Sequence, residues 1–475
     1  MIAVCSLCVA EPFLRARIEQ EGISTVCDFC HATDRQSICI EKLAEWVHEV
    51  LSEHFIITSP EPEGIDYLLA KEGRWEQPGA PVAIVIADIA QLDEGLADAV
   101  RDYLSDQHDD HGSDGMVELQ PYDDDTHYEA LPVETAAFED TWQSFRQEIQ
   151  TRARFFNQSA KESLDSLFKD IGDFSTRHGS VIRTLTPEDC IVRGRLATSM
   201  AEMVEIIKEA PRSLGAPSYD NARAGRMNAE GIPVFYGALS IATCVAELRA
   251  PVGSLVISGV FRPVRELRVL DLTRLGDAYR SSSFFDPDEQ RTASRLAFLR
   301  QLEGELNIPV MPGAEARDYL PTQAVSEYIA SADGLNLDGL MFTSSQIARK
   351  MTEQFWPHER DEANKNIVLF SHACVLEHHE LLPPHRIAVD CHENPPPYDD
   401  EYEIEIVEYA PDTGLKAHDA ADPGNGGAEQ PRAYGLPTLS LDMASIDVQK
   451  IEGISFDMSH RPVYRHRYED EDPEF

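Results

Sequence analysis

Apolar residues recur at helical spacing through the first third of the chain. The run EKLAEWVHEVLSEHF places a single stripe on one helix face, formed by Leu43, Trp46, Val47, Val50 and Leu51. The same spacing returns in LDEGLADAVRDYL and in the long run FEDTWQSFRQEIQTRARFFNQSAKESLDSLFKDI. A shorter run, VAIVIA at Val82–Ala87, is apolar without interruption and has the character of a strand. The pattern therefore predicts a mainly helical region from about Cys39 to Ile171.

The period of the pattern changes at about Thr184. Strand-like runs (PVFYGAL, SLVISGVF, LRVLDL, LDGLMF, NIVLFS) alternate with helical runs (IATCVAELR, RLAFLRQLEGEL, PTQAVSEYIAS) as far as Leu376. Beyond it, the strand-like segments HRIAVD, YEIEIVEY and HRPVYRHRY are separated by NPPPYDDE and by the Gly/Pro-rich APDTGLKAHDAADPGNGGAEQP. We expect an α+β domain followed by a β-rich extension that contains an acidic loop.

Four cysteines near the start of the chain form two CxxC pairs. Cys5 and Cys8 make the first pair, Cys27 and Cys30 the second, and 18 residues separate them. Paired knuckles at this spacing allow four thiolates to close a tetrahedron around zinc. CDFCH also matches a c-type haem attachment site, but that interpretation gives no reason for the first pair. The sequence predicts a structural zinc site.

Charge and length restrict the class of protein. The chain has 475 residues, with 84 acidic and 41 basic side chains and a formal net charge of −43. This length predicts two or three domains, and this charge disfavours binding to nucleic acid or anionic lipid. No secretory leader is visible, and the VAIVIA run stops at Asp88, far short of the roughly 20 residues that a membrane helix needs. We expect a cytoplasmic protein with reduced cysteines and no membrane partner.

The stretch GRMNAEGIPVFYGALSIATCVAELRAP, Gly225–Pro251, holds a cation, an aromatic ring and a carboxylate in one strand-to-helix unit. Arg226 lies in the loop and Tyr236 in the apolar strand, and Glu247 lies about two turns into a helix that begins after the cap-like Ser240. Taken alone, the stretch favours a structural interpretation, with an ion pair between Arg226 and Glu247 and with Tyr236 as a core strand residue.

This stretch resembles the hallmark of the RES domain family, which is Gly-Arg-x-Asn, an apolar strand ending in tyrosine, and a helix with glutamate. IVRGRL matches the upstream arginine segment of the family, with its first arginine at Arg193. LDGLMFTSSQ matches a later strand that ends in serine, here Ser344, and KNIVLF matches the Asn-led closing strand. Phe342 stands where the family more often has tyrosine. The resemblance covers about Thr184–Leu376, and the preceding region is similar to the HEPN-like segment found ahead of RES domains.

The resemblance implies an ADP-ribosyltransferase-like fold and a site that consumes NAD, as in the toxins of bacterial toxin–antitoxin pairs. Arg193 and Arg226 would hold the diphosphate or the ribose. Tyr236 would stack on the nicotinamide, where cation–π attraction contributes roughly 0.5–2 kcal/mol. Glu247 would accept a ribose hydroxyl and stabilise the developing positive charge. Ser344 would bind a phosphate or the nicotinamide amide.

We therefore expect an enzyme that cleaves the nicotinamide–ribose bond, with NAD as substrate, in a toxin or defence role. Transfer of ADP-ribose to a protein or nucleotide uses the same site and stays open. A non-catalytic NAD-binding module is a third alternative, which the glutamate disfavours because a sensor has no need for that carboxylate. Such an activity needs restraint, from an antitoxin or regulatory protein, from the N-terminal domain, or from the acidic loop at Asp412–Pro431.

Two further patterns carry weaker signals. Arg101 and His108 match the loose R-x6-H pattern of HEPN ribonucleases, although the acidic surroundings repel RNA. The segment from His372 to His392 is rich in histidine and cysteine but has no fixed ligand spacing. We interpret the former as a solvated helix end and the latter as strand positions.

The expected organisation has four parts. They are a zinc knuckle at 1–36, a helical HEPN-like domain at 37–180, a RES domain at 184–376, and a β extension with an acidic loop at 377–475.

Overall fold

The computed structural model describes residues 2–62, 64, 66–108, 120–279, 283–306, 308, 310, 313–332, 334–347, 362–377, 386–393, 402–409 and 436–455. The chain divides into two compact units. The first comprises Met1–Gln143 with Tyr279–Arg300, and the second comprises Ser144–Ala278 with Gln301–Phe475. None of the described helices is both long enough and apolar enough to cross a membrane.

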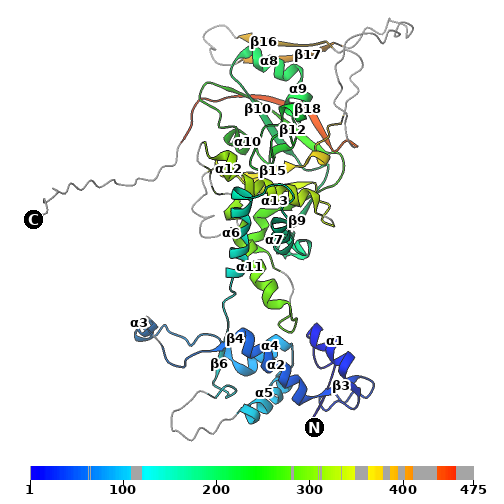
Figure 1. The fold of residues 1–475 in the computed structure, drawn as a ribbon, viewed down its shortest axis with the longest axis vertical. Coiled ribbons are helices and arrows are strands. Elements are labelled where there is room, and N and C mark those ends of the chain that lie inside the picture. The colour runs from blue at the N-terminus through cyan, green and yellow to red at the C-terminus, as the bar shows by residue number, and fades with distance from the viewer. Residues whose placement is uncertain are drawn as a thin grey trace, which may run out of the picture. The chain divides into compact units, whose positions relative to one another are not determined.

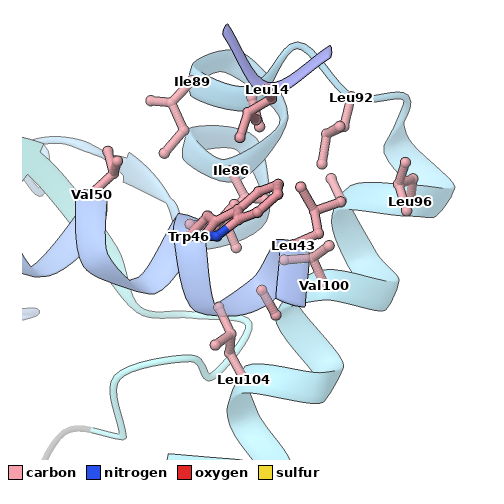
Figure 2. Packing of buried hydrophobic residues seen from close by; sticks show 14 of the residues in the cluster. Leu14, Leu43, Trp46, Val50, Ile86, Ile89, Leu92, Leu96, Val100 and Leu104 are labelled. Carbon is pink, nitrogen blue, oxygen red and sulfur yellow. The ribbon is translucent and has the colours of Figure 1, made fainter. Parts of the chain in front are cut away.

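The first unit is mainly helical, as the apolar pattern predicts. Its helices are α1 (Pro12–Glu21), α2 (Ile40–His54), α3 (Asp66–Lys71), α4 (Val82–Ala90) and α5 (Glu94–His108). Two three-stranded sheets accompany them. The strand order of the first is β1 (Ala3–Cys5), β3 (Gln36–Cys39), β2 (Ile23–Ser24). The strand order of the second is β4 (Phe55–Ile57), β6 (His127–Ala130), β5 (Ala80–Pro81). The predicted stripe of α2 is buried, and Trp46 packs among Leu43, Ile86 and Val100 in the core (Figure 2).

The VAIVIA run forms helix α4, so its interpretation as a strand is wrong. Within α4, Val82, Val85, Ile86 and Ile89 are buried at helical spacing, while Ile84 is exposed. The sequence of a continuous apolar run does not reveal whether it is a helix or a strand. Here the helical period is hidden because the exposed face of α4 also carries apolar residues.

The long helical run predicted at Phe138–Ile171 forms two α-helices. They are α6 (Ala136–Thr151) and α7 (Gln158–Phe168). Asn157 caps α7 by accepting a hydrogen bond from the backbone N–H of Ala160 at 3.0 Å. Phe156, just before the cap, has a φ of 56°, a left-handed conformation that does not continue a helix. The apolar periodicity is present on both sides of this break because each helix buries one face.

The second unit is built on one eight-stranded sheet (Figure 1). Its order is β18 (Leu439–Lys450), β12 (Leu255–Pro263), β10 (Ile191–Ala197), β11 (Phe235–Ala238), β15 (Lys365–Leu369), β14 (Gly339–Thr343), β13 (Leu267–Asp271) and β9 (Ile182–Leu185). Only the β13–β14 pair is parallel among these neighbours. The architecture confirms the predicted α+β class, and the strand-like runs from Thr184 to Leu376 form the expected strands.

This unit contains α7 and the C-terminal part of α6. Its other described helices are α8 (Met200–Lys208), α9 (Ala210–Leu214), α10 (Ile241–Leu248), α11 (Glu289–Leu306, which begins in the first unit), α12 (Glu315–Asp318) and α13 (Leu320–Ser331). Short hairpins are formed by β7 (Ser175–Thr176) with β8 (Gly179–Ser180), and by β16 (Arg386–Glu393) with β17 (Tyr402–Tyr409).

The C-terminal segment contributes directly to the central sheet. β18, a strand that the sequence pattern does not predict, pairs with β12 through residues 439–442 and 447–450, with a register shift between them. HRIAVD and YEIEIVEY form strands β16 and β17, as expected, and the structure pairs them antiparallel. HRPVYRHRY and the acidic loop lie outside the described residues.

The two faces of the sheet carry different side chains, because successive residues of a strand point to opposite sides. Ile191, Phe235, Ile257 and Ile367 share one face with residues of α8 and α9 in a hydrophobic cluster, and we call this the core face. The other face is covered by α10. A Cβ on Gly194 would lie 3.1 Å from Sγ of Cys244 there, so glycine allows the helix to approach β10 closely. We call this the α10 face.

Candidate functional site

Helix α10 presents Glu247 from a firmly anchored N-terminus. Ser240 caps the helix, as the sequence predicts, by accepting a hydrogen bond from the N–H of Thr243 at 3.2 Å. The hydroxyl of Thr243 also donates to the carbonyl oxygen of Ala363 at 2.6 Å. Ala363 belongs to a 3-10 helix, η5 (Glu362–Asn364), that leads into β15. The helix is therefore fixed to the sheet before it reaches Glu247.

The carboxylate of Glu247 is held through one of its two oxygens. Its Oε1 accepts a hydrogen bond from Oγ of Ser344 at 2.5 Å and another from Nδ2 of Asn366 at 2.7 Å. Both donors are 4% exposed, whereas Glu247 itself is exposed. Among the described residues, Oε2 has no hydrogen-bond donor and the carboxylate has no cationic partner. Such short bonds to one oxygen are typical of charge-assisted contacts, and they leave the second oxygen available to a ligand.

Tyr236 lies on the α10 face of β11, with its hydroxyl bound to the preceding loop. The hydroxyl donates to Oδ1 of Asn228 at 2.9 Å and accepts from the N–H of Met227 at 2.9 Å. Burial raises the pKa of Tyr236, so the phenol is neutral at physiological pH. These bonds fix the Gly-Arg-x-Asn loop against the strand that follows it.

Arg226 extends from the same loop. Its guanidinium donates to the carbonyl oxygens of Leu306 at 3.3 Å and Ile308 at 3.2 Å, and its Cζ lies 5.9 Å from the ring centroid of Tyr319. No ion pair joins Arg226 to Glu247 within the described part of the chain. The structural alternative suggested by the sequence, an ion pair between these two residues, therefore does not form here.

Arg193 lies on the opposite face of the sheet from Tyr236. It pairs with Gly259 on the core face, and its Cζ lies 4.8 Å from the ring centroid of Phe235. Its Nη1 donates to the carbonyl oxygen of Tyr236 at 3.0 Å. Burial lowers the pKa of Arg193 to about 10, which leaves the side chain charged at neutral pH. The described residues place no carboxylate within ion-pair distance of it.

The structure thus gathers the predicted residues into two contacts rather than one cluster. Glu247 and Ser344 meet directly, and Arg226 lies on the loop that the hydroxyl of Tyr236 anchors. Arg193 reaches only the backbone of Tyr236, from the other face. Sequence reasoning missed Asn366 as a site residue, although it stands at the start of the Asn-led strand. A hollow of about 400 Å³ lined by Arg262 and residues 440–444 contains none of these side chains.

The four predicted zinc ligands come together in the first unit. The Sγ atoms of Cys5, Cys8, Cys27 and Cys30 all lie within 4.8 Å of one another. Measured separations include 3.8 Å for Cys5–Cys8, 3.4 Å for Cys5–Cys30 and 3.7 Å for Cys8–Cys27. Tetrahedral Zn–S bonds of about 2.3 Å require sulfur atoms about 3.8 Å apart, so the cluster fits zinc.

The electrostatic environment of this cluster is uneven. Burial on its own raises the pKa of Cys27, but backbone N–H groups of Cys30 and Phe29 donate to its sulfur, and the pKa is lowered to about 7. Burial raises the pKa of Cys8. A cation would offset the cost of ionising the buried thiols, since metal binding requires thiolates.

The R-x6-H pattern lies at the end of α5, where both residues have partners. Arg101 pairs with Asp102 at 2.6 Å and with Asp124. The ring of His108 stacks on His48 with centroids 4.2 Å apart, and Nδ1 of His48 lies 2.5 Å from the hydroxyl of Tyr122. Two carboxylates at Arg101 compete with a phosphodiester for its guanidinium, which disfavours the ribonuclease alternative.

The histidine-rich segment is only partly described. His372 is exposed and lies 3.7 Å from Oδ1 of Asp338, while Cys374 is buried in the core. His378, His379 and His385 lie outside the described residues. His372 and Cys374 belong to no metal-ligand cluster among the described residues.

Comparison with protein families finds a similarity within the second unit. The RES domain model matches residues 207–390, a span that includes β11, α10, β14 and β15. This part of the chain is therefore similar to the RES domain family, and Arg193 lies upstream of the matched residues. No curated protein and no solved structure matches the chain.

Proposed function

We propose that the protein cleaves the nicotinamide–ribose bond of NAD. The observation that carries the proposal is the carboxylate of Glu247, which is exposed, has no cationic partner among the described residues, and is held through Oε1 by two buried donors within a RES domain. A surface carboxylate without a specific role would face bulk water and would not need two buried donors on one of its oxygens. The RES match supports a site related to NAD, and we propose an ADP-ribosyltransferase-like core for the unit.

The chemistry needs few groups. The C–N bond to nicotinamide breaks, nicotinamide leaves as a neutral molecule, and water adds to the ribose carbon with release of one proton. The free oxygen of Glu247 would accept a ribose hydroxyl and stabilise positive charge as it develops on the sugar. It would also orient the incoming water. In the proposed site Tyr236 supplies an aromatic face for the pyridinium, and Ser344 contacts the substrate beside Glu247.

The two arginines would act differently from each other. Arg226, on the loop that Tyr236 anchors, is the proposed ligand of the diphosphate or ribose. For Arg193 the geometry favours an indirect role in NAD binding, because its guanidinium holds the carbonyl of Tyr236 from the core face. Arg193 would thus set the position of β11.

ADP-ribosyl transfer is the second candidate. Glu247 is exposed, so an acceptor side chain or nucleotide has access to it as well as water. We further propose that zinc closes the four-cysteine cluster, where it would tie β1 to the Cys27–Cys30 turn and have no part in the reaction. A HEPN-like identity for the N-terminal helices, a cytoplasmic toxin or defence role, and an antitoxin or regulatory partner complete the proposal.

Product analysis tests the function directly. Purified protein is incubated with NAD, and the products are separated by chromatography and mass spectrometry. Free nicotinamide with ADP-ribose supports hydrolysis, and nicotinamide with an ADP-ribosylated protein supports transfer. Intact NAD at stoichiometric protein, with binding detected by calorimetry, would instead support the binding module and exclude the enzyme.

A further inference from the structure

We propose that the segment Glu362–Asn366 is a positioning element that fixes the Glu247 carboxylate for catalysis. The inference rests on the proposed function and extends it to residues outside the predicted site. It begins from a simple relationship: this short segment contacts the helix that carries Glu247, the serine that binds Glu247, and the carboxylate itself.

The first contact is made at the start of α10. The carbonyl oxygen of Ala363 lies 2.6 Å from Oγ1 of Thr243 and 2.8 Å from Oγ of Ser240. Thr243 is fully buried, so its hydroxyl has a defined partner rather than water. Two hydroxyls from the first turn of the helix thus bind one carbonyl of the segment.

The second set of contacts is made at the carboxylate. Nδ2 of Asn366 donates to Oε1 of Glu247 at 2.7 Å. The carbonyl oxygen of Asn364 accepts the N–H of Ser344 at 2.9 Å, and this bond places the Ser344 hydroxyl on the same Oε1. Both donors to Glu247 are therefore located by residues within three positions of each other.

The segment is itself anchored to the sheet. Lys365 points to the core face, where its Nζ lies 3.1 Å from Oδ2 of the fully buried Asp271 and also contacts Glu362. Glu362 in turn pairs with Arg183 at 2.8 Å. Because Lys365 and Asn366 are adjacent on β15, one is held on the core face while the other holds Glu247 on the α10 face. Buried ion pairs of this kind add little net stability but restrict geometry.

The consequence is orientation of the free oxygen of Glu247. The helix is fixed at its first turn and the carboxylate at its tip, so Oε2 has a narrow range of positions. Misplacement of a catalytic group by about 1 Å lowers the rate about 100-fold. Loosening the segment should therefore reduce kcat while leaving KM nearly unchanged, since the groups proposed to hold NAD are not altered.

The experiment compares four single variants of the full-length protein by nicotinamide release. Thr243→Val removes the donor to Ala363 with little change of shape, and Thr243→Ser restores a hydroxyl. Asn366→Asp replaces the donor to Glu247 with an acceptor. Ser258→Ala is the matched control, because it removes a buried hydroxyl of the same sheet that bonds Gln449 at 3.2 Å. Circular dichroism checks that each variant is folded.

We expect Thr243→Val and Asn366→Asp to lower kcat about 10- to 100-fold with KM within about twofold of wild type. Thr243→Ser should recover most of kcat, and Ser258→Ala should match wild type. If the folded Thr243→Val variant has the wild-type kcat, or shows only an increase in KM, the positioning role is overturned. The proposed NAD-cleaving activity is not affected by that result. If Asn366→Asp does not fold, the Thr243 pair decides the question. Absence of nicotinamide release by the wild type would overturn the proposed function, and the inference with it.

Discussion

Asn366 donates its side-chain amide to Oε1 of Glu247 at 2.7 Å, across a separation of 119 residues in the chain. This hydrogen bond joins the first residues of β15 to the end of α10. Together with the bond from Ser344, it holds one oxygen of a carboxylate whose residue is exposed.

Replacement of Glu247 tests whether that carboxylate is catalytic. Glu247→Gln keeps the size of the side chain but removes its charge, and nicotinamide release should fall at least about 100-fold. Thermal unfolding should change little, because the amide oxygen of glutamine still accepts the hydrogen bonds from Ser344 and Asn366. The control is Glu202→Gln, which lies in α8 and bonds Thr198 at 2.9 Å, and it should retain wild-type activity. Equal turnover in both variants removes Glu247 from the mechanism.

Arg193 should contribute to activity rather than to stability. Its guanidinium is desolvated without a carboxylate among the described residues, so Arg193→Met should leave the free energy of unfolding unchanged or raise it by about 1–2 kcal/mol. NAD turnover should drop at least about tenfold, because the carbonyl of Tyr236 loses its donor. Urea unfolding and nicotinamide release measure the two effects. Arg195→Met, on an exposed neighbour of the same strand, serves as control. Strong destabilisation with unchanged specific activity would contradict this assignment.

Gly194 should be intolerant of a side chain because α10 packs directly on it. A Cβ there would lie 3.1 Å from both Sγ of Cys244 and Cγ1 of Val256. Gly194→Ala should destabilise the protein by about 1–3 kcal/mol and lower kcat, since the displaced helix carries Glu247. Adding Cys244→Ala should recover part of both losses. Gly304, in α11 with open space around it, is the control. Gly304→Ala should be neutral or stabilise by about 0.5–1 kcal/mol, and denaturant titrations measure both positions.

The cysteine cluster should bind one zinc ion per chain. Cys8→Ser should abolish stoichiometric zinc, measured by mass spectrometry of the purified protein, and should lower the melting temperature of the N-terminal unit. Zinc affinity should fall as pH decreases, because protons compete for the thiolates. The control is Cys39→Ser, which changes a cysteine outside the cluster and should still bind one zinc ion per chain. Nicotinamide release should persist in both variants if the zinc is purely structural. The proposed zinc site is contradicted if Cys8→Ser retains one zinc ion per chain.

The sequence pattern predicted the structure correctly where residues close together in the chain determine it. The stripe on α2 and the Ser240 cap of α10 depend on residues within one or two helical turns, and both appear as predicted. The two CxxC pairs also meet as their spacing indicates. Pattern failed for VAIVIA, where an unbroken apolar run carries no period, and for β18, whose pairing with β12 depends on a neighbour far away in the sequence.

The sequence by itself therefore determined the α+β class, the RES-like motif, the four-cysteine cluster and the residue types on which the proposed NAD chemistry depends. Only the tertiary structure decided that Arg193 faces away from Tyr236, that Asn366 binds Glu247, and that Thr243 binds Ala363. The physical reason is that strand pairing sets which face each side chain occupies, and a shift of one residue in register moves every side chain to the other face. Register among β10, β11 and β15 arises from contacts between distant segments, so no local pattern records it.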